Sequence, residues 1–199
     1  MTRLPPLIEA LLEVARALDE LELPYLVGGS LASSTYGEAR TTQDVDVLVD
    51  LDADALESLL DRLGSAFYAD DERARRAIES GSSFNAIHLA TMSKIDLFIA
   101  GGEPMNRNQL DRRRFIELPD VPGVTLPIAS PEDVIVQKLR WYRLGSETSE
   151  RRQWRDAENV VRVQRDALDR QYLSEAARES GVEDLLGQLL LESEQERES

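Results

Sequence analysis

The segment Asp44–Asp50, with the sequence DVDVLVD, has a valine at every second position, and three of the four residues between and around the valines are acidic. This period of two is typical of a β-strand with one face in the core. Val45, Val47 and Val49 then point into the core, and the side chains of Asp44 and Asp46 emerge together on the opposite face. Two neighbouring carboxylates repel each other unless a cation lies between them. The chain must therefore fold around a sheet that carries this acidic pair at the start of a strand.

A third acidic residue interrupts a second apolar strand, KIDLFIA. Ile95, Leu97 and Ile99 share one face of this strand, and Asp96 lies on the other. A half-buried carboxylate without a partner is costly, so Asp96 needs a partner. Mg²⁺ prefers a few carboxylates together with substrate phosphates, and an ion held by all three aspartates would satisfy this chemistry.

A glycine turn precedes the acidic pair. The short apolar run Tyr25–Val27 is followed by Gly28, Gly29 and Ser30 and then by a stretch of small residues that ends at Gly37, which predicts strand, turn and helix. Backbone amides at the start of such a helix, with the Ser30 hydroxyl, can cradle a triphosphate. Glycine turns and Asp-x-Asp pairs at solvated strand ends are each common on their own, so the prediction depends on their combination, with 13 residues between Ser30 and Asp44.

The remaining patterns predict an α+β fold, with a mixed β-sheet flanked by helices and a C-terminal helical region. The α/β part covers residues 1–129 and the helical part covers residues 130–199, or the two form one continuous domain. Ser130 and Pro131 followed by two acids predict a helix start. Helices are expected at 4–21, 54–63, 71–80, 104–110 and beyond 130, and further strands at 84–89, 94–100, 114–118 and 124–128.

Composition limits the function classes. The formal net charge of −15 argues against nucleic-acid binding by bulk attraction, although residues 101–165 hold 12 basic and 10 acidic side chains. The arginines of this segment either recognise phosphate or form a solvated surface. The absence of cysteine excludes disulfides and thiolate sites. No apolar run approaches the roughly 18 residues of a membrane span, and the N-terminus does not have the pattern of a signal peptide, so we expect a cytoplasmic protein without membrane association.

The glycine turn, the Asp-x-Asp pair and the later aspartate together, in VGGSLASSTYGEARTTQDVDVLV and KIDLFIA, resemble the nucleotidyltransferase superfamily that includes DNA polymerase β. More narrowly, the run from Arg40 and Thr42 into the acidic pair resembles the stand-alone bacterial branch that contains the AbiEii-type toxins. Proteins of that branch tend to carry a helical lysine and a later Arg/Lys-Asp pair, which match Lys138 in EDVIVQKLRWYR and Asp156 in RQWRDAENVV.

The resemblance implies an enzyme that moves NMP from an NTP to an acceptor and releases pyrophosphate, with two Mg²⁺ ions, or Mn²⁺ in their place. Asp44, Asp46 and Asp96 would be the metal ligands and catalytic residues, and Asp96 would hold the ion beside the acceptor hydroxyl. The nucleotide-binding residues would be Gly28, Gly29, Ser30, Arg40, Thr42, Lys138 and Asp156. The acceptor is a small molecule, a protein or an RNA, and an antitoxin protein is a further partner if the chain is a toxin of a toxin–antitoxin system.

Two other functions compete with this one. The chain would otherwise be a catalytically inactive nucleotidyltransferase-like binding module or partner protein, or an enzyme that transfers a phosphoryl group from the same metal site. Individual residues also have structural interpretations: Lys138 as a surface lysine paired with a nearby acid, Asp156 as a helix-surface acid, and His88 as a structural residue of a strand.

Overall fold

The computed structural model describes residues 4–39, 41–118, 121–145 and 147–198. These residues form two compact units, and each is described by itself. The first contains residues 1–28 and 42–128, and the second contains residues 29–41 and 129–199. The domain boundary after residue 129 stays a prediction, and the compact units differ from it because residues 29–41 group with the C-terminal helices.

Within the described part of the first unit, seven strands form one mixed sheet in the order β3-β4-β5-β2-β1-β7-β6. β2 runs parallel to β5 and antiparallel to β1, and β1 runs parallel to β7. The pairs β3–β4, β4–β5 and β6–β7 are antiparallel. The strands are β1 (Tyr25–Val27), β2 (Asp44–Val49), β3 (Phe67–Ala69), β4 (Ser83–His88), β5 (Ser93–Ile99), β6 (Arg114–Glu117) and β7 (Thr125–Ile128).

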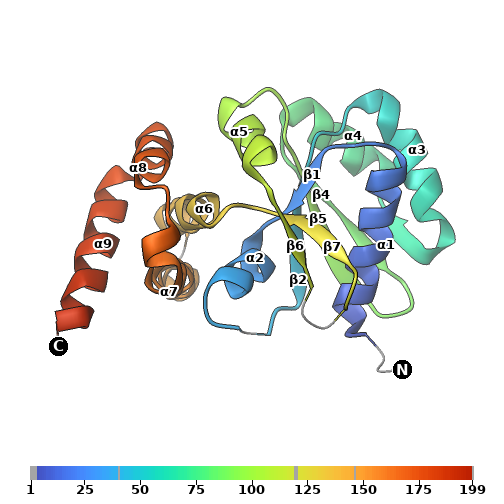
Figure 1. Ribbon diagram of the computed structural model, residues 1–199. Coiled ribbons are helices and arrows are strands. Elements are labelled where there is room, and N and C mark those ends of the chain that lie inside the picture. Colours follow the sequence, from blue (N-terminus) through green and yellow to red (C-terminus); the bar gives the residue numbers. More distant parts are fainter. Residues whose placement is uncertain (1–3, 40, 119–120, 146, 199) are drawn as a thin grey trace. The chain divides into compact units, whose positions relative to one another are not determined.

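Helices cover the apolar face of this sheet. Val45, Val47 and Ile95 are almost completely buried, as the alternating patterns of their strands require. α1 (Pro6–Glu20) packs against β5, β2 and α3 (Ala53–Leu63), and α4 (Asp71–Ser80) packs against β4 and α3 (Figure 1). α3 and α4 begin at aspartate caps, Asp52 and Asp70, whose side chains accept backbone N–H bonds. The unit also contains α5 (Pro104–Arg112) and the short 3₁₀ turn Gly64–Ala66.

The second unit is helical. α6 (Pro131–Leu144) contacts α7 (Glu147–Gln164), α8 (Arg170–Glu179), α9 (Glu183–Glu198) and α2 (Gly29–Tyr36). Its first half is buried on all sides, from Pro131 to Val136, which is expected of a helix with neighbours around it. A 3₁₀ turn, Arg165–Ala167, follows α7.

Two buried acids at the start of α6 attach α8. Asp133 Oδ1 accepts a hydrogen bond from the Tyr172 hydroxyl at 2.6 Å, and Glu132 Oε1 accepts one from the Asp169 backbone N–H at 2.8 Å. The hydroxyl of Ser130 donates to Asp133 Oδ2 at 2.6 Å and accepts the N–H of the same residue at 3.2 Å. The acids that predicted a helix start therefore also join two helices.

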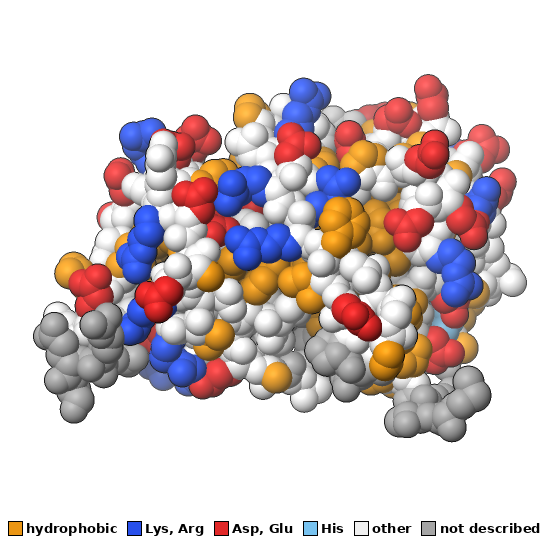
Figure 2. Space-filling model, viewed as in Figure 1, with side chains coloured by type: hydrophobic (Ala, Val, Ile, Leu, Met, Phe, Trp, Pro, Cys, Tyr) orange, Lys and Arg blue, Asp and Glu red, His pale blue; other side chains and the backbone are white. Residues whose placement is uncertain are grey.

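The formal net charge is −15, and acidic and basic side chains are interspersed on the face that Figure 2 shows. In the segment that is rich in arginine, the guanidinium of Arg113 lies over the ring of Phe115, 5.6 Å from its centroid. Over the described ranges, no helix combines the length and the apolar character that crossing a membrane requires.

Replacement of Gly37 by alanine should destabilise the second unit, because α2 ends close against α7. A Cβ at this position would lie 3.0 Å from the Ser33 carbonyl oxygen and 3.2 Å from the backbone carbonyl carbon of Asn159. We expect Gly37→Ala to lower the free energy of unfolding by about 1–3 kcal/mol, measured by urea denaturation. The contrasting variant is Gly187→Ala within α9, where nothing lies within 4 Å of the added Cβ and a gain of about 0.5–1 kcal/mol is expected. Equal stability of the two variants would contradict this packing.

Candidate active site

The three aspartates singled out in the sequence lie on one face of two adjacent parallel strands. In the register of β2 and β5, Asp46 is the Cα partner of Asp96, and Asp44 is the Cα partner of Lys94. Side chains two residues apart share a face, so all four project from the same side of the sheet. The Asp96 side chain is more sheltered than that of Asp44, with 18% of it exposed against 48% for Asp44. The first unit thus brings together residues separated by 50 positions in the chain.

Lys94 occupies this face together with the carboxylates. Its ammonium group donates to Asp96 Oδ2 at 2.6 Å and lies 3.9 Å from Asp44 Oδ2. The pKa of Lys94 is raised above its ordinary value, chiefly by the hydrogen bond to Asp96 and further by the charges of Asp96, Asp44 and Asp46, against the opposing effect of burial. The sequence predicted that Asp96 needs a partner but did not identify Lys94, although its position two residues earlier on the same strand is the signal.

The donor set fits Mg²⁺ by chemistry and by strand register. Three carboxylates on neighbouring positions offer the hard oxygen ligands that Mg²⁺ prefers. In the described conformation, however, no group of three or more His, Cys, Asp or Glu side chains of the described residues is arranged to hold a metal ion. The Lys94 ammonium group instead neutralises Asp96 and approaches Asp44. A bound ion would require these side chains to rearrange.

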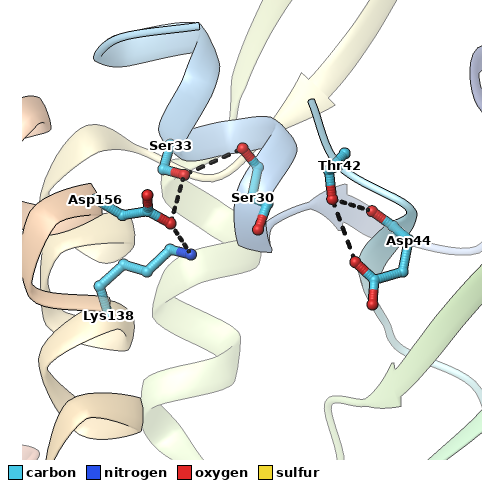
Figure 3. Close-up of polar contacts among 6 residues, drawn as sticks. All are labelled: Ser30, Ser33, Thr42, Asp44, Lys138 and Asp156. Atoms are coloured by element: carbon cyan, nitrogen blue, oxygen red, sulfur yellow. Dashed lines mark hydrogen bonds and ion pairs between the residues drawn. The ribbon is translucent and has the colours of Figure 1, made fainter. Parts of the chain in front are cut away.

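The Thr42 hydroxyl group is hydrogen-bonded to Asp44. The hydroxyl oxygen lies 3.0 Å from the backbone oxygen of Asp44 and 3.2 Å from Asp44 Oδ1 (Figure 3). One hydroxyl hydrogen is shared between these two acceptors, which orients the carboxylate at the start of β2. Arg40, the other residue predicted in this loop, lies outside the described residues.

The glycine turn is attached to the carboxylate strand through Gly28, whose N–H donates to the backbone oxygen of Asp46 at 2.8 Å. Gly29 then begins α2 with φ of 56°, a left-handed conformation that favours glycine. Ser30 follows in the first turn of the helix, the end whose dipole favours anions. The predicted order of strand, turn and helix is present.

The second unit brings Lys138 and Asp156 together. The Lys138 ammonium group donates to Asp156 Oδ2 at 2.7 Å, and both side chains are buried. Asp156 is therefore not a helix-surface acid. Ser33, which the sequence analysis did not single out, lies beside them: its hydroxyl is 3.4 Å from Asp156 Oδ2 and 3.1 Å from the carbonyl oxygen of Ser30 (Figure 3). Nothing in the sequence predicts this contact, because Ser33 and Asp156 are 123 residues apart in the chain.

His88 takes part in packing. Its Nδ1 lies 2.8 Å from the Thr91 hydroxyl oxygen, and its ring is 5.0 Å from that of Phe67. The residue is buried and is the Cα partner of Phe67 on β3. This environment agrees with the structural interpretation.

Solved structures share the fold at low sequence identity. The chain is similar to the antibiotic-resistance factor ANT(2'')-Ia in solution, with 16% identity, 86% of this chain and 96% of that chain covered, and a TM-score of 0.50. A crystal structure of ANT(2")-Ia in complex with adenylyl-2"-tobramycin gives 14% identity, 87% and 95% coverage, and a TM-score of 0.52. An antigenic nucleotidyltransferase-like protein from Paracoccidioides brasiliensis gives 20% identity, 78% and 75% coverage, and a TM-score of 0.54. The expected nucleotidyltransferase fold is thereby confirmed.

The sequence itself matches a known family over almost its whole length. No curated protein matches the chain. Residues 10–198, however, match the family described as nucleotidyl transferase AbiEii toxin, type IV TA system. This match extends over most of both compact units and includes all the candidate residues named above. The chain therefore belongs to the AbiEii family, and it is a nucleotidyltransferase.

Proposed function

We propose that this chain is the toxin of a toxin–antitoxin system and that it moves NMP from an NTP to an acceptor, with Mg²⁺ and with release of pyrophosphate. The observation that carries this proposal is the face formed by Asp44, Asp46 and Asp96 on β2 and β5 in a chain of the AbiEii family. Family membership supports the transfer reaction in general, and the carboxylate face supports its dependence on a metal.

The carboxylates have distinct proposed roles. Asp44 and Asp46 would hold Mg²⁺, and Thr42 keeps Asp44 oriented for this through its hydroxyl. Asp96 would complete the ligand set and accept the proton of the acceptor hydroxyl. When bound, Mg²⁺ supplies neutralisation of the charge on the attacking and leaving oxygens. The protein contributes the fixed spacing of the carboxylates, which the parallel pairing of β2 and β5 sets.

The nucleotide would be held by its phosphates. The first backbone amides of α2 and the Ser30 hydroxyl would bind the β- and γ-phosphates, since a helix N-terminus favours anions. Gly28 and Gly29 allow the backbone to turn at this point. Lys138, oriented by Asp156, is the proposed point charge for the triphosphate, and Arg40 is a further proposed phosphate contact.

The acceptor and the preferred NTP are to be identified by labelling. Purified protein is incubated with each of the four α-³²P-labelled NTPs, Mg²⁺ and total cellular RNA, protein or a small-molecule extract. We expect one acceptor class to become labelled, and we expect EDTA to abolish the labelling. Expression of the wild-type chain should arrest growth of its host, and expression of Asp46→Asn should not. Labelling that persists in EDTA would contradict the dependence on a metal.

A further inference from the structure

The Lys94 ammonium group interacts with carboxylate oxygens that a metal ion would use as ligands. Asp44 Oδ1 is hydrogen-bonded by Thr42, Asp44 Oδ2 lies 3.9 Å from Lys94 Nζ, and Asp96 Oδ2 lies 2.6 Å from the same nitrogen. The β2–β5 register fixes this arrangement, because it places Lys94 directly opposite Asp44 and two residues before Asp96 on one face.

This ion pair differs from the exposed pairs elsewhere in the chain. The Arg76–Glu72 pair of α4 joins side chains that are 66% and 85% exposed, and pairs of this kind contribute little to stability. Asp96 is only 18% exposed and has Asp46 as its cross-strand neighbour, so its charge is poorly solvated and adjacent to a like charge. A cation beside Asp96 relieves both effects.

We propose that Lys94 is the internal counter-ion of the carboxylate face: it holds Asp96 and Asp44 when no metal is bound, and it withdraws when a divalent cation takes their oxygens. This inference rests on the proposed function, because it assumes that the three aspartates are the metal ligands. A lysine suits the role, since its ammonium is a compact charge on a flexible four-carbon stem that can swing towards solvent. The Lys94 side chain is already 40% exposed.

Lys94 and a divalent cation thus compete for the same carboxylate oxygens. This competition lowers the affinity of the protein for the metal ion in the absence of nucleotide. A positive charge within about 4 Å of the ion opposes binding, and the ion pair with Asp96 must also break. Removal of the charge should therefore tighten metal binding. The same removal should lower the free energy of unfolding of the metal-free protein, because the Lys94 charge then no longer offsets the repulsion among the three carboxylates.

Direct titration of Mn²⁺ by electron paramagnetic resonance tests this inference without nucleotide and without an activity measurement. We expect Lys94→Gln to bind Mn²⁺ about tenfold more tightly than the wild type, and Lys94→Arg, which keeps the charge, to bind it no more tightly than the wild type. Equal or weaker binding by Lys94→Gln would overturn the counter-ion role.

The control for the metal site is Asp46→Asn. If it binds Mn²⁺ as the wild type does, the aspartates are not the ligands, and the proposed metal site fails together with the inference. If it loses Mn²⁺ while Lys94→Gln gains nothing, the inference alone fails. The two failures are therefore distinguishable.

A second measurement uses the unmodified protein, in case Lys94→Gln does not fold. The sequence contains two lysines, Lys94 and the buried Lys138, so amine acylation followed by mass spectrometry separates them readily. We expect saturating Mg²⁺ to raise the acylation rate of Lys94 several-fold, because the ammonium leaves Asp96, and to leave Lys138 unchanged. An unchanged or slower reaction at Lys94 would contradict withdrawal.

Discussion

We expect Asp46→Asn to lower the rate of nucleotidyl transfer by about 10³-fold or more while the fold is retained. Asparagine has the size and shape of aspartate but lacks the negative charge that a divalent cation requires from a ligand. The side chain of Asp46 is only half-buried at the start of β2, so the exchange leaves the core valines of the strand in place. Turnover of the α-labelled NTP identified above measures the loss, and a circular dichroism melt verifies the fold.

The matched control is Asp50→Asn, which removes the same charge just beyond the end of the same strand. Asp50 is exposed and has no place in the proposed ligand set. We expect this variant to keep at least about half of the wild-type rate, since exposed surface substitutions have small effects. Comparable losses in the two variants would indicate a general effect of charge and would contradict the assignment of Asp46.

The second large effect concerns the buried pair of Lys138 and Asp156. Lys138→Met should lower the free energy of unfolding by about 3–5 kcal/mol, because it leaves the Asp156 carboxylate buried without its ammonium partner. Asp156→Asn should have a similar effect, since the ammonium then stays buried without its anion. Urea denaturation measures both losses.

The double variant Lys138→Met/Asp156→Leu separates structure from function. It removes both charges and should regain most of the stability that the single variants lose. Transfer should nevertheless remain strongly reduced, because the proposed contact of Lys138 with the triphosphate is absent. Glu72→Gln, in an exposed pair of α4, is the stability control and should change the free energy by at most about 0.5 kcal/mol. A fully active double variant would mean that the pair is purely structural.

Much of the fold could be predicted from local patterns. The alternation in Asp44–Asp50 gave the strand β2, and Ser130 with Pro131 gave the start of α6, as the structure has them. The strand β3 was missed because three residues at the edge of the sheet carry too short a pattern, and only their pairing with β4 defines them.

Only the part of the candidate site that depends on local patterns could be predicted from the sequence. The shared face of Asp44 and Asp46 follows from a period of two, but the alignment of Asp46 with Asp96 depends on the pairing of distant strands. The contact of Ser33 with Asp156 depends in the same way on the packing of α2 against α7. Local patterns do not specify such long-range pairings, so the alignment of Lys94 with Asp44 and the contact of Ser33 with Asp156 emerged only from the structure.

Parallel reactions with α-³²P-ATP and γ-³²P-ATP, or with whichever NTP proves to be preferred, test nucleotidyl transfer most directly. The proposed reaction places the α-label on the acceptor and the γ-label in pyrophosphate, in equal amounts, and Asp46→Asn produces neither. Appearance of the γ-label on the acceptor, with a nucleoside diphosphate as the other product, would contradict nucleotidyl transfer and would establish phosphoryl transfer in its place.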